Sequence, residues 1–385
     1  MHHHHSVLRE LLKRVPWCVV DRLVAEHGAD RRVRHLSTRR QLVALLFGQF
    51  SGAVSLREIE AASASQAARL YHAGGRAVSR STLADANARR PAAVFTELFS
   101  HLAAQAGRGL RRKIAGAVRL IDSSGLRLAG LGTEWAGFSA GVCGAKMHVV
   151  YDPDAACPLY AGVTPARIND IVVARTMPVE PGATYVFDLG YYDYAWWAAL
   201  DAAGCRIVTR FKASTPLRIT QERAVPDDDG TILSDAVGRL PARQAKSRRN
   251  PFEAPVREIR VRIETGRILR ILTNDLEAPA REIADLYKRR WDIELFFRWV
   301  KQTLRIRHFL GRSENAVRIQ VAVALIAYML LKLTQAAQRA VASPIAFARL
   351  VRLNLMHRRP TDQLVRPPNP SPNHPDQLAF TLCPA

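Results

Sequence analysis

The stretch from Ala284 to Arg305, ADLYKRRWDIELFFRWVKQTLR, contains neither glycine nor proline. Because it is rich in helix-forming residues, it predicts one continuous helix. At about 100° per residue, four polar side chains fall within an arc of roughly 60°: Tyr287, Arg290, Glu294 and Lys301. The adjoining arc is apolar, which indicates that the helix packs one stripe against a core and carries these four residues along its edge.

This polar edge combines one acid with two bases and a phenol. A carboxylate beside cations that can hold phosphates suits metal-dependent phosphoryl chemistry. The alternative is an ordinary amphipathic helix, since Arg290 and Glu294 stand four residues apart, the spacing of a common intrahelical ion pair. The spacing within this stretch does not decide between the two.

The composition of the chain favours a polyanionic partner. Its 385 residues, 48% hydrophobic and 23% charged, predict a globular protein of two or three domains. A net charge of +22 favours nucleic acid, with an anionic membrane as the competitor. No apolar run of membrane-spanning length and no signal peptide is visible. Five cysteines without C-x-x-C spacing fit a reducing cytoplasm and argue against a disulfide framework.

Residues 1–112 are expected to form a helical DNA-binding domain. Helical periodicity is present in four runs, at 7–15, 37–50, 55–71 and 81–90. The last two runs and the glycine turn between them resemble a helix-turn-helix, which predicts DNA contacts from Arg80 and Ser81. A fragment ending near Ala106 is then expected to bind DNA by itself. A plain helical bundle with capped ends is the alternative, since this motif has no strict sequence code.

Residues 113–340 predict a mixed α/β domain. Apolar runs around Asp122, at 146–152 and at 159–165 indicate three strands, which are followed by a helix. A further strand ends at Asp188 and precedes a second helix and a fifth strand. Residues 213–280 show regular alternation, as in VREIRVRIE, and indicate a β-rich insertion. Residues 341–385 are basic and Pro-rich, and we expect a partly disordered tail there.

Three carboxylates stand out in this domain. Asp122 and Asp188 each follow a hydrophobic strand run, where side chains at the end of a sheet converge on one crevice. Either one alone is more often a turn or cap residue than a metal ligand. Glu294 adds a third carboxylate, and hard cations such as Mg²⁺ take oxygen ligands of this kind. The chain has no P-loop, G-x-S-x-G, H-E-x-x-H or dinucleotide-binding glycine motif.

Other residues near these acids are weaker candidates. Four residues beside the predicted sheet could support the site: Lys146, His148, Asn169 and Asp170. For His148 a satisfied core histidine is the stronger interpretation. Trp291 and Trp299 could stack on an extruded base, with ordinary packing as the alternative.

The order Asp122, Asp188, Glu294 resembles the DDE transposases of bacterial insertion sequences. The Tyr-x2-Arg-x3-Glu-x6-Lys spacing from Tyr287 to Lys301 is similar to the YREK signature of the insertion-sequence-four family. The surrounding segments LIDSSGLRL, FDLGYYDYAWW and IVTRFK agree, and the resemblance spans residues 6–331. One departure is Leu189 after the second acid, where many relatives carry arginine.

The resemblance implies an RNase H-like core interrupted by a β-rich insertion and preceded by helices. It implies that Asp122, Asp188 and Glu294 hold two Mg²⁺ ions, for which Mn²⁺ can substitute. It further implies that Tyr287, Arg290 and Lys301 contact DNA near the cleaved end, where Trp291 is a further candidate.

The function expected from this resemblance is DNA transposition. The protein would bind the terminal inverted repeats of an element as double-stranded DNA, cleave a phosphodiester there and join the freed 3′ end to target DNA. We expect a homodimer in the synaptic complex and a location in the bacterial cytoplasm, at the nucleoid. The alternatives are a nuclease of the same fold without strand transfer and a decayed transposase that acts as a DNA-binding repressor.

Overall fold

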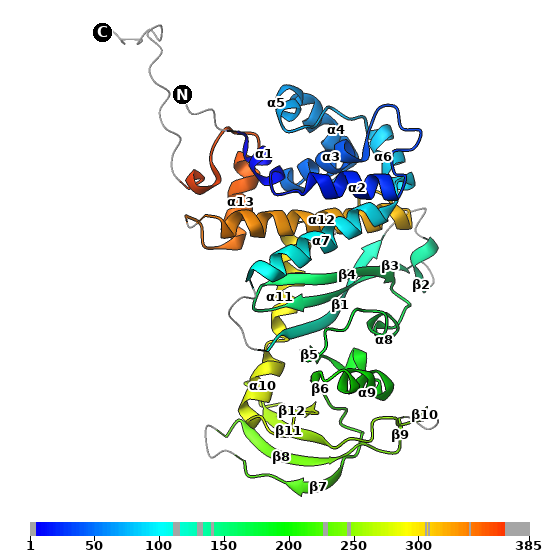
Figure 1. Ribbon diagram of the computed structural model, residues 1–385, viewed down its shortest axis with the longest axis vertical. Coiled ribbons are helices and arrows are strands. Elements are labelled where there is room, and N and C mark those ends of the chain that lie inside the picture. The colour runs from blue at the N-terminus through cyan, green and yellow to red at the C-terminus, as the bar shows by residue number, and fades with distance from the viewer. Residues whose placement is uncertain are drawn as a thin grey trace, which may run out of the picture.

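The computed structural model describes residues 5–110, 116–128, 134–139, 142–225, 230–244, 248–304, 306, 309–338 and 340–365. Figure 1 shows an elongated molecule with helices at one end, a mixed sheet in the middle and antiparallel strands at the other end. The first and last described segments meet at the helical end, where Ser6 forms a β-bridge with Arg358.

The N-terminal part of the chain is helical, as predicted. Its helices are α1 (Val7–Leu12), α2 (Trp17–Glu26), α3 (Thr38–Ser51), α4 (Leu56–Ser65), α5 (Ala67–His72), α6 (Arg80–Arg89) and α7 (Ala92–Leu110). Serine side chains cap α3, α4 and α6, each accepting a hydrogen bond from the backbone N–H three residues on. The single helix predicted over 55–71 is two helices that meet at Gln66, and α2 lies outside the predicted runs.

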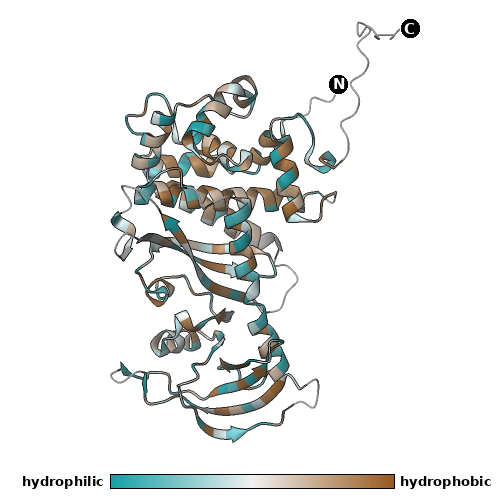
Figure 2. Ribbon diagram, turned by 180° about the vertical axis from the view of Figure 1, so that it is seen from behind, coloured by the Kyte–Doolittle hydropathy of each residue, from teal (hydrophilic) through white to brown (hydrophobic). Residues whose placement is uncertain are grey.

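The centre of this bundle comes from the other end of the chain. Helix α12 (Glu314–Ala336) is buried along almost its whole length and packs against α3, α6 and α7. It has the length and hydropathy of a membrane span, but 78% of its apolar window is buried inside the protein. Figure 2 shows hydrophobic residues gathered along α12 and the helices around it. Residues 1–112 are therefore not the self-contained domain that was predicted, because α12 supplies much of their core.

The predicted tail begins with an ordered helix. Helix α13 (Pro344–Asn354) buries Phe347 and Val351 against α12, α3 and α11, so the first part of this segment packs on the helical bundle. A short helix, η3 (Thr361–Gln363), follows. The Pro-rich remainder of the predicted tail, 366–385, lies outside the described residues.

The central sheet has the order β4-β3-β1-β5-β6. Its first three strands are antiparallel: β1 (Val118–Leu128), β3 (Val142–Asp152) and β4 (Cys157–Pro165). Strands β5 (Thr184–Phe187) and β6 (Arg206–Arg210) run parallel to β1. The connections contain η1 (Glu134–Ala136), β2 (Gly137–Ser139), α8 (Asp170–Ala174), η2 (Leu189–Tyr191) and α9 (Tyr194–Ala202). This confirms the predicted RNase H-like α/β core.

The β-rich insertion continues this sheet. Its strands are β7 (Arg218–Glu222), β8 (Ile232–Arg239), β9 (Arg243–Gln244), β10 (Arg248–Arg249), β11 (Val256–Arg262) and β12 (Ile268–Thr273). Strand β12 pairs with β6, and β11, β8 and β7 follow in antiparallel order. A buried ion pair joins two of them, because Arg257 donates to Asp235 at 2.8 and 2.6 Å. Four strands of the insertion thus extend the central sheet, while β9 and β10 pair with each other in a separate two-stranded sheet.

The stretch 284–305 is not the single helix that its sequence predicts. Helix α10 (Ala280–Lys288) ends and α11 (Trp291–Thr303) begins around Arg289 and Arg290. Since no glycine or proline is present, tertiary contacts override helix propensity here. Arg289 contacts Asp154, and Arg290 turns toward Asp122. The arc calculated for one continuous helix therefore does not apply across this break to Tyr287, which lies on α10.

Candidate active site

Asp122 and Asp188 lie side by side on neighbouring parallel strands. The parallel pairing of β1 and β5 ends at Ile121 and Phe187, so the two acids are the next residues on their strands. Asp188 is at the end of β5, as predicted, and its Oδ1 accepts a hydrogen bond from Gly190 N at 2.8 Å. Asp122 lies within β1, as the apolar run around it predicted, because β1 continues to Leu128 in its pairing with β3. Beyond the end of β5, the edge of β1 that faces β5 is therefore not paired with another strand among the described residues.

The surroundings of Asp122 disfavour its charged form. Burial, together with the charges of Asp188 and Glu294, raises its pKa to about 6. The hydrogen bond from Ser123 N at 2.7 Å and the charge of Arg290 act in the opposite direction. An acid held in this state gains from a neighbouring cation, and the position suits a divalent metal ion.

Arg290 stands between Asp122 and Glu294. Its Nη2 lies 2.6 Å from Glu294 Oε1, and its Nη1 lies 3.7 Å from Asp122 Oδ2. Glu294 is in the first turn of α11, so Arg290 and Glu294 form the i,i+4 pair that their spacing allowed. Within the residues that the structure describes, no three acids, histidines or cysteines are grouped closely enough to hold a metal ion. The guanidinium occupies the place where a cation would join the two carboxylates.

The other residues of the signature surround this centre unequally. Tyr287 is buried, its pKa is raised by burial, and the Arg290 guanidinium lies 5.9 Å from the centre of its ring. Trp291 is 56% exposed, with the same guanidinium 5.8 Å from its ring. Lys301 lies in the last turn of α11, about 10 Å along the helix from Glu294 at 1.5 Å per residue. Trp299 packs edge-on against Tyr328, which supports the packing interpretation for that residue.

Three of the weaker candidates, Lys146, His148 and Asp170, form a polar group next to Ser123, the residue that follows Asp122. Asp170 Oδ1 accepts hydrogen bonds from Ser123 Oγ at 2.9 Å and from Lys146 Nζ at 3.1 Å. His148 is fully buried and its Nε2 lies 2.8 Å from Thr164 Oγ1. Burial lowers its pKa to about 4. Its Nδ1 is buried without a hydrogen-bond partner among the described residues and lies 3.6 Å from Asp170 Oδ1, so the histidine is only partly satisfied.

Sequence reasoning missed two members of this group. Ser123 joins Asp122 to Asp170, through its backbone N–H to the first and its hydroxyl to the second. Among the described residues, the hydroxyl of Tyr191 is buried without a hydrogen-bond partner. Burial, and after it the carboxylates of Asp170, Asp122 and Asp188, raise its pKa. The only available signal was the position of these residues beside the two acids in the sequence.

The donor set fits a hard divalent cation. Carboxylate oxygens on adjacent strands and on α11 are the ligands that Mg²⁺ takes, together with water and phosphate oxygens. The buried Tyr191 hydroxyl adds an unpaired polar atom at the same place. Arg290 contacts Glu294 Oε1, so a metal ion would compete with this guanidinium for the Glu294 carboxylate.

Arg80 and Ser81 lie outside this site. They open α6 in the helical part, while the acids lie on the central sheet and on α11 (Figure 1). Both side chains are exposed, and Ser79, which precedes them, caps the helix by accepting a hydrogen bond from Thr82 N. This arrangement leaves the start of α6 accessible to a partner.

Comparisons with known proteins connect the site to a family. A family model described as "Transposase DDE domain" matches residues 115–330, which include all three acids, and a "Domain of unknown function (DUF4372)" matches residues 3–76. The chain is 43% identical over 307 residues to "Putative transposase y4zB" of Sinorhizobium fredii, covering 77% of this chain and 85% of that protein.

Two further matches are more distant. "Probable transposase for insertion sequence element IS5377" of Geobacillus stearothermophilus is 27% identical over 245 residues, which are 63% of each chain. The solved structure of a piggyBac transposase synaptic complex with hairpin DNA aligns over 95% of this chain and 83% of that one. Its TM-score of 0.45 and 12% identity are too low to support an inference.

Proposed function

This chain belongs to the DDE transposase family, whose members are metal-dependent enzymes that cleave and join DNA, and we propose that Asp122, Asp188 and Glu294 are its acidic triad. The single observation that supports this most strongly is the register of β1 and β5, which sets the two aspartates side by side. The contacts of Arg290 add support, because they link Glu294 to the same centre.

The triad would hold Mg²⁺ ions, two when the site is full, and Mn²⁺ could replace them. Bound metal would supply Lewis-acid stabilisation of charge at the reacting phosphate. The residues of the chain have to bind the DNA end, orient it and keep it in place between cleavage and joining. Asp122 and Asp188 are ready to act as ligands from the sheet, whereas Glu294 is engaged by Arg290.

Arg290 would change partners when DNA binds. A guanidinium can bind a phosphate through two parallel hydrogen bonds, in the same geometry in which it binds a carboxylate. The phosphate of the DNA end would therefore draw Arg290 away from Glu294 and leave that carboxylate free for metal. Metal binding and DNA binding would support each other, so that the site is complete only when the substrate is present.

The remaining signature residues would hold the cleaved end. Lys301 extends the positive surface along α11, and Tyr287 supports the guanidinium of Arg290 from α10. Trp291 offers an exposed ring at the start of α11, where an unpaired base could stack. Joining requires that the end stay docked until target DNA arrives, and charge-assisted contacts to phosphate slow its release.

The helical end of the molecule would select the DNA. We assign recognition of the terminal inverted repeats to the start of α6, with Arg80 and Ser81 in contact with the duplex. Two ends have to be held together for transposition, so the acting species would be a homodimer on DNA at the bacterial nucleoid. Target DNA is the second double-stranded partner.

The test is incubation of the protein with a labelled candidate terminal repeat, target DNA and Mg²⁺, scoring nicked, double-cut and joined products. Asp188→Asn should lose all three products while DNA binding persists, because binding rests on Lys and Arg contacts to phosphate. Asp285→Asn is the matched control, since this exposed acid lies on α10 and pairs only loosely with Arg281 at 3.8 Å. Full cutting by Asp188→Asn would refute the triad.

The same assay separates transposase from nuclease. Wild-type protein that cuts the repeat but joins nothing, with any metal or target, would favour a nuclease of this fold. Binding without cutting would favour a repressor. Joined products that depend on all three acids would establish the proposed reaction.

A further inference from the structure

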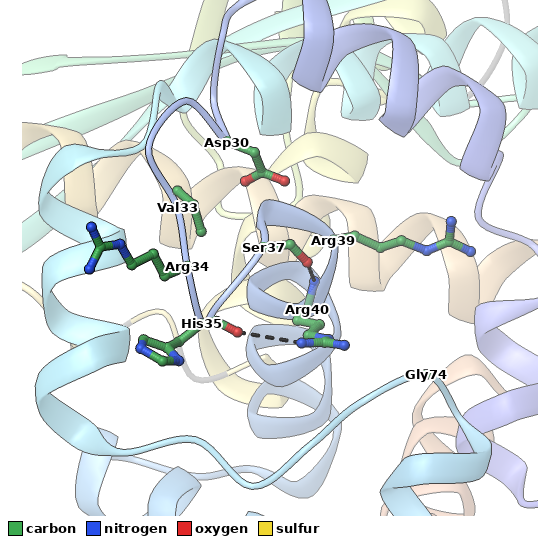
Figure 3. A pocket seen from close by; sticks show the side chains of 8 residues that line it. All are labelled: Asp30, Val33, Arg34, His35, Ser37, Arg39, Arg40 and Gly74. Atoms are coloured by element: carbon green, nitrogen blue, oxygen red, sulfur yellow. Dashed lines mark hydrogen bonds between the residues drawn. The ribbon is translucent and has the colours of Figure 1, made fainter.

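A positively charged pocket lies in the helical part of the molecule, away from the acids. The connection between α2 and α3, the start of α3 and Gly74 enclose a pocket of about 540 Å³. Four of its lining residues are basic: Arg34, His35, Arg39 and Arg40. We call this set the arginine pocket (Figure 3). It falls within residues 3–76, the region that matches a domain of unknown function.

The charge of the arginine pocket is largely uncompensated. Within the described part of the chain, Arg34 and Arg40 form no ion pair with a carboxylate, and Arg40 only donates to His35 O at 3.4 Å. Arg39 lies 3.5 Å from Asp21 and stacks over Trp17. The acid in the pocket wall, Asp30, is already taken up by other donors, since its Oδ1 accepts from Thr38 N and Thr38 Oγ1 at 2.7 Å each.

A buried arginine holds this pocket in shape. Arg90 is 7% exposed, and its Nη1 donates to Asp30 Oδ1 and Thr38 Oγ1 at 2.5 Å each. Its Nη2 donates to Leu36 O, so one side chain fixes both ends of the connection. Arg90 is also the C-cap residue of α6, and its carbonyl accepts a hydrogen bond from Asn315 of α12 at 2.7 Å. The arginine pocket is thereby fixed relative to α6.

The directions of the side chains indicate the kind of ligand. Figure 3 shows Arg34 and Arg39 pointing to opposite sides of the pocket, with Arg40 between them. A single small anion would need guanidinium groups that converge on one point. Groups that diverge along a surface suit a series of phosphates, as along the backbone of a duplex.

We infer that the arginine pocket binds the phosphate backbone of duplex DNA next to the segment contacted by α6. This inference rests on the proposed function, in which the helical end holds the ends of the element. The contacts position the protein without reading sequence, because phosphates are the same at every base pair. Arg90 keeps the pocket and α6 in one rigid unit, so that docking of the backbone sets the register of α6.

The experiment measures binding of the full-length protein to a short labelled duplex of random sequence, between about 50 and 200 mM salt. Each phosphate contact contributes about 0.9 to the slope of log affinity against log salt, so Arg34→Ala/Arg40→Ala should lower that slope by about two. Binding at the lower salt concentration should weaken about tenfold or more. Both side chains lack carboxylate partners in the described residues, so an unchanged melting temperature is expected.

The matched control is Arg349→Ala/Arg358→Ala, which removes two exposed charges from the same half of the molecule, on and after α13. It should leave the slope within experimental error of wild type. An unchanged slope in the pocket variant, or an equal loss in the control, would overturn the inference. This binding experiment does not measure cleavage. If wild-type protein binds the duplex here but yields no cut product in the separate product assay, that result counts against the proposed function and not against this inference.

Discussion

Arg290 is bonded to the acid that the proposed metal site requires. If its 2.6 Å contact holds Glu294 away from metal, Arg290→Gln should bind Mn²⁺ more tightly than wild type in the absence of DNA. The expected gain is about tenfold, because a charge-assisted hydrogen bond no longer competes for the carboxylate. The same variant should lose joining of DNA ends. Calorimetric titration of the DNA-free protein with Mn²⁺ gives the first result, and the product assay gives the second.

The neighbouring arginine supplies a control for this prediction. Arg289→Gln removes the same charge, but its guanidinium contacts Asp154 outside the triad. Its Mn²⁺ affinity should stay close to that of wild type. Equal or weaker Mn²⁺ binding by Arg290→Gln would mean that Glu294 is not restrained by this contact.

His148 makes the stability of the protein depend on pH. Its pKa falls from 6.5 in the unfolded chain to about 4 in the folded one, because burial disfavours the imidazolium. The unfolded state therefore binds the proton first, and stability present above pH 6.5 is lost as pH falls toward 4. At complete titration the loss is about 3 kcal/mol. Urea unfolding at several pH values should show a shallower acid loss for His148→Gln, while exposed His357→Gln keeps the wild-type slope.

At the scale of single residues, the sequence indicated the chemistry and the contacts within one helix, but not the contacts between distant segments. The three acids could be proposed because each carboxylate stands in a recognisable run: Asp122 and Asp188 beside apolar strands, and Glu294 within a spaced signature. The bond between Arg290 and Glu294 could also be proposed from i,i+4 spacing. The approach of Ser123 and Tyr191 to the acids depends on the pairing of distant strands, which no local pattern encodes.

The junction between α6 and α7 depends on one buried charge. Arg90→Ala would remove the charged donor to Asp30 and the side-chain donor to Leu36 O. Because Asp30 is partly exposed and keeps its hydrogen bonds from Thr38, the free energy of unfolding should fall by about 1.5–3 kcal/mol. The matched variant is Arg89→Ala, the exposed neighbour in the last turn of α6, which should change stability by no more than about 0.5 kcal/mol. Chemical denaturation of both variants is the measurement. Similar losses in the two would show that Arg90 has no special role.

Elements were predicted well where one local rule acts. The strands around the acids and the helices with Ser caps follow apolar periodicity and capping, and both were expected. The break at Arg289 and Arg290 was missed because no glycine or proline marks it. There the contacts of two arginines with Asp154 and Asp122 override local preference, and only the fold brings those partners near.

At the scale of the molecule, segments that are far apart in sequence pack together and form hydrogen bonds. Val7 N and Leu8 N donate to His357 O and Leu355 O at 3.0 and 2.9 Å, so the first helix is bonded to the end of the described chain. The change in composition near residue 112 suggested a domain boundary there. Composition marks where the kind of structure changes, but it does not show that α12 returns to fill the helical bundle.

The N-terminal helices depend on α12 for much of their core. A fragment of residues 1–110 should fail to fold cooperatively, because α7 and α3 would expose the apolar faces that pack against α12. Each large apolar side chain left in water costs about 1.5–3 kcal/mol, and several such losses exceed the roughly 5–15 kcal/mol that stabilises a domain. Fusing residues 309–365 to the fragment through a Gly/Ser linker should restore a single urea transition followed by circular dichroism, along with binding to duplex DNA. A cooperative transition in the fragment alone would show that the bundle does not require α12.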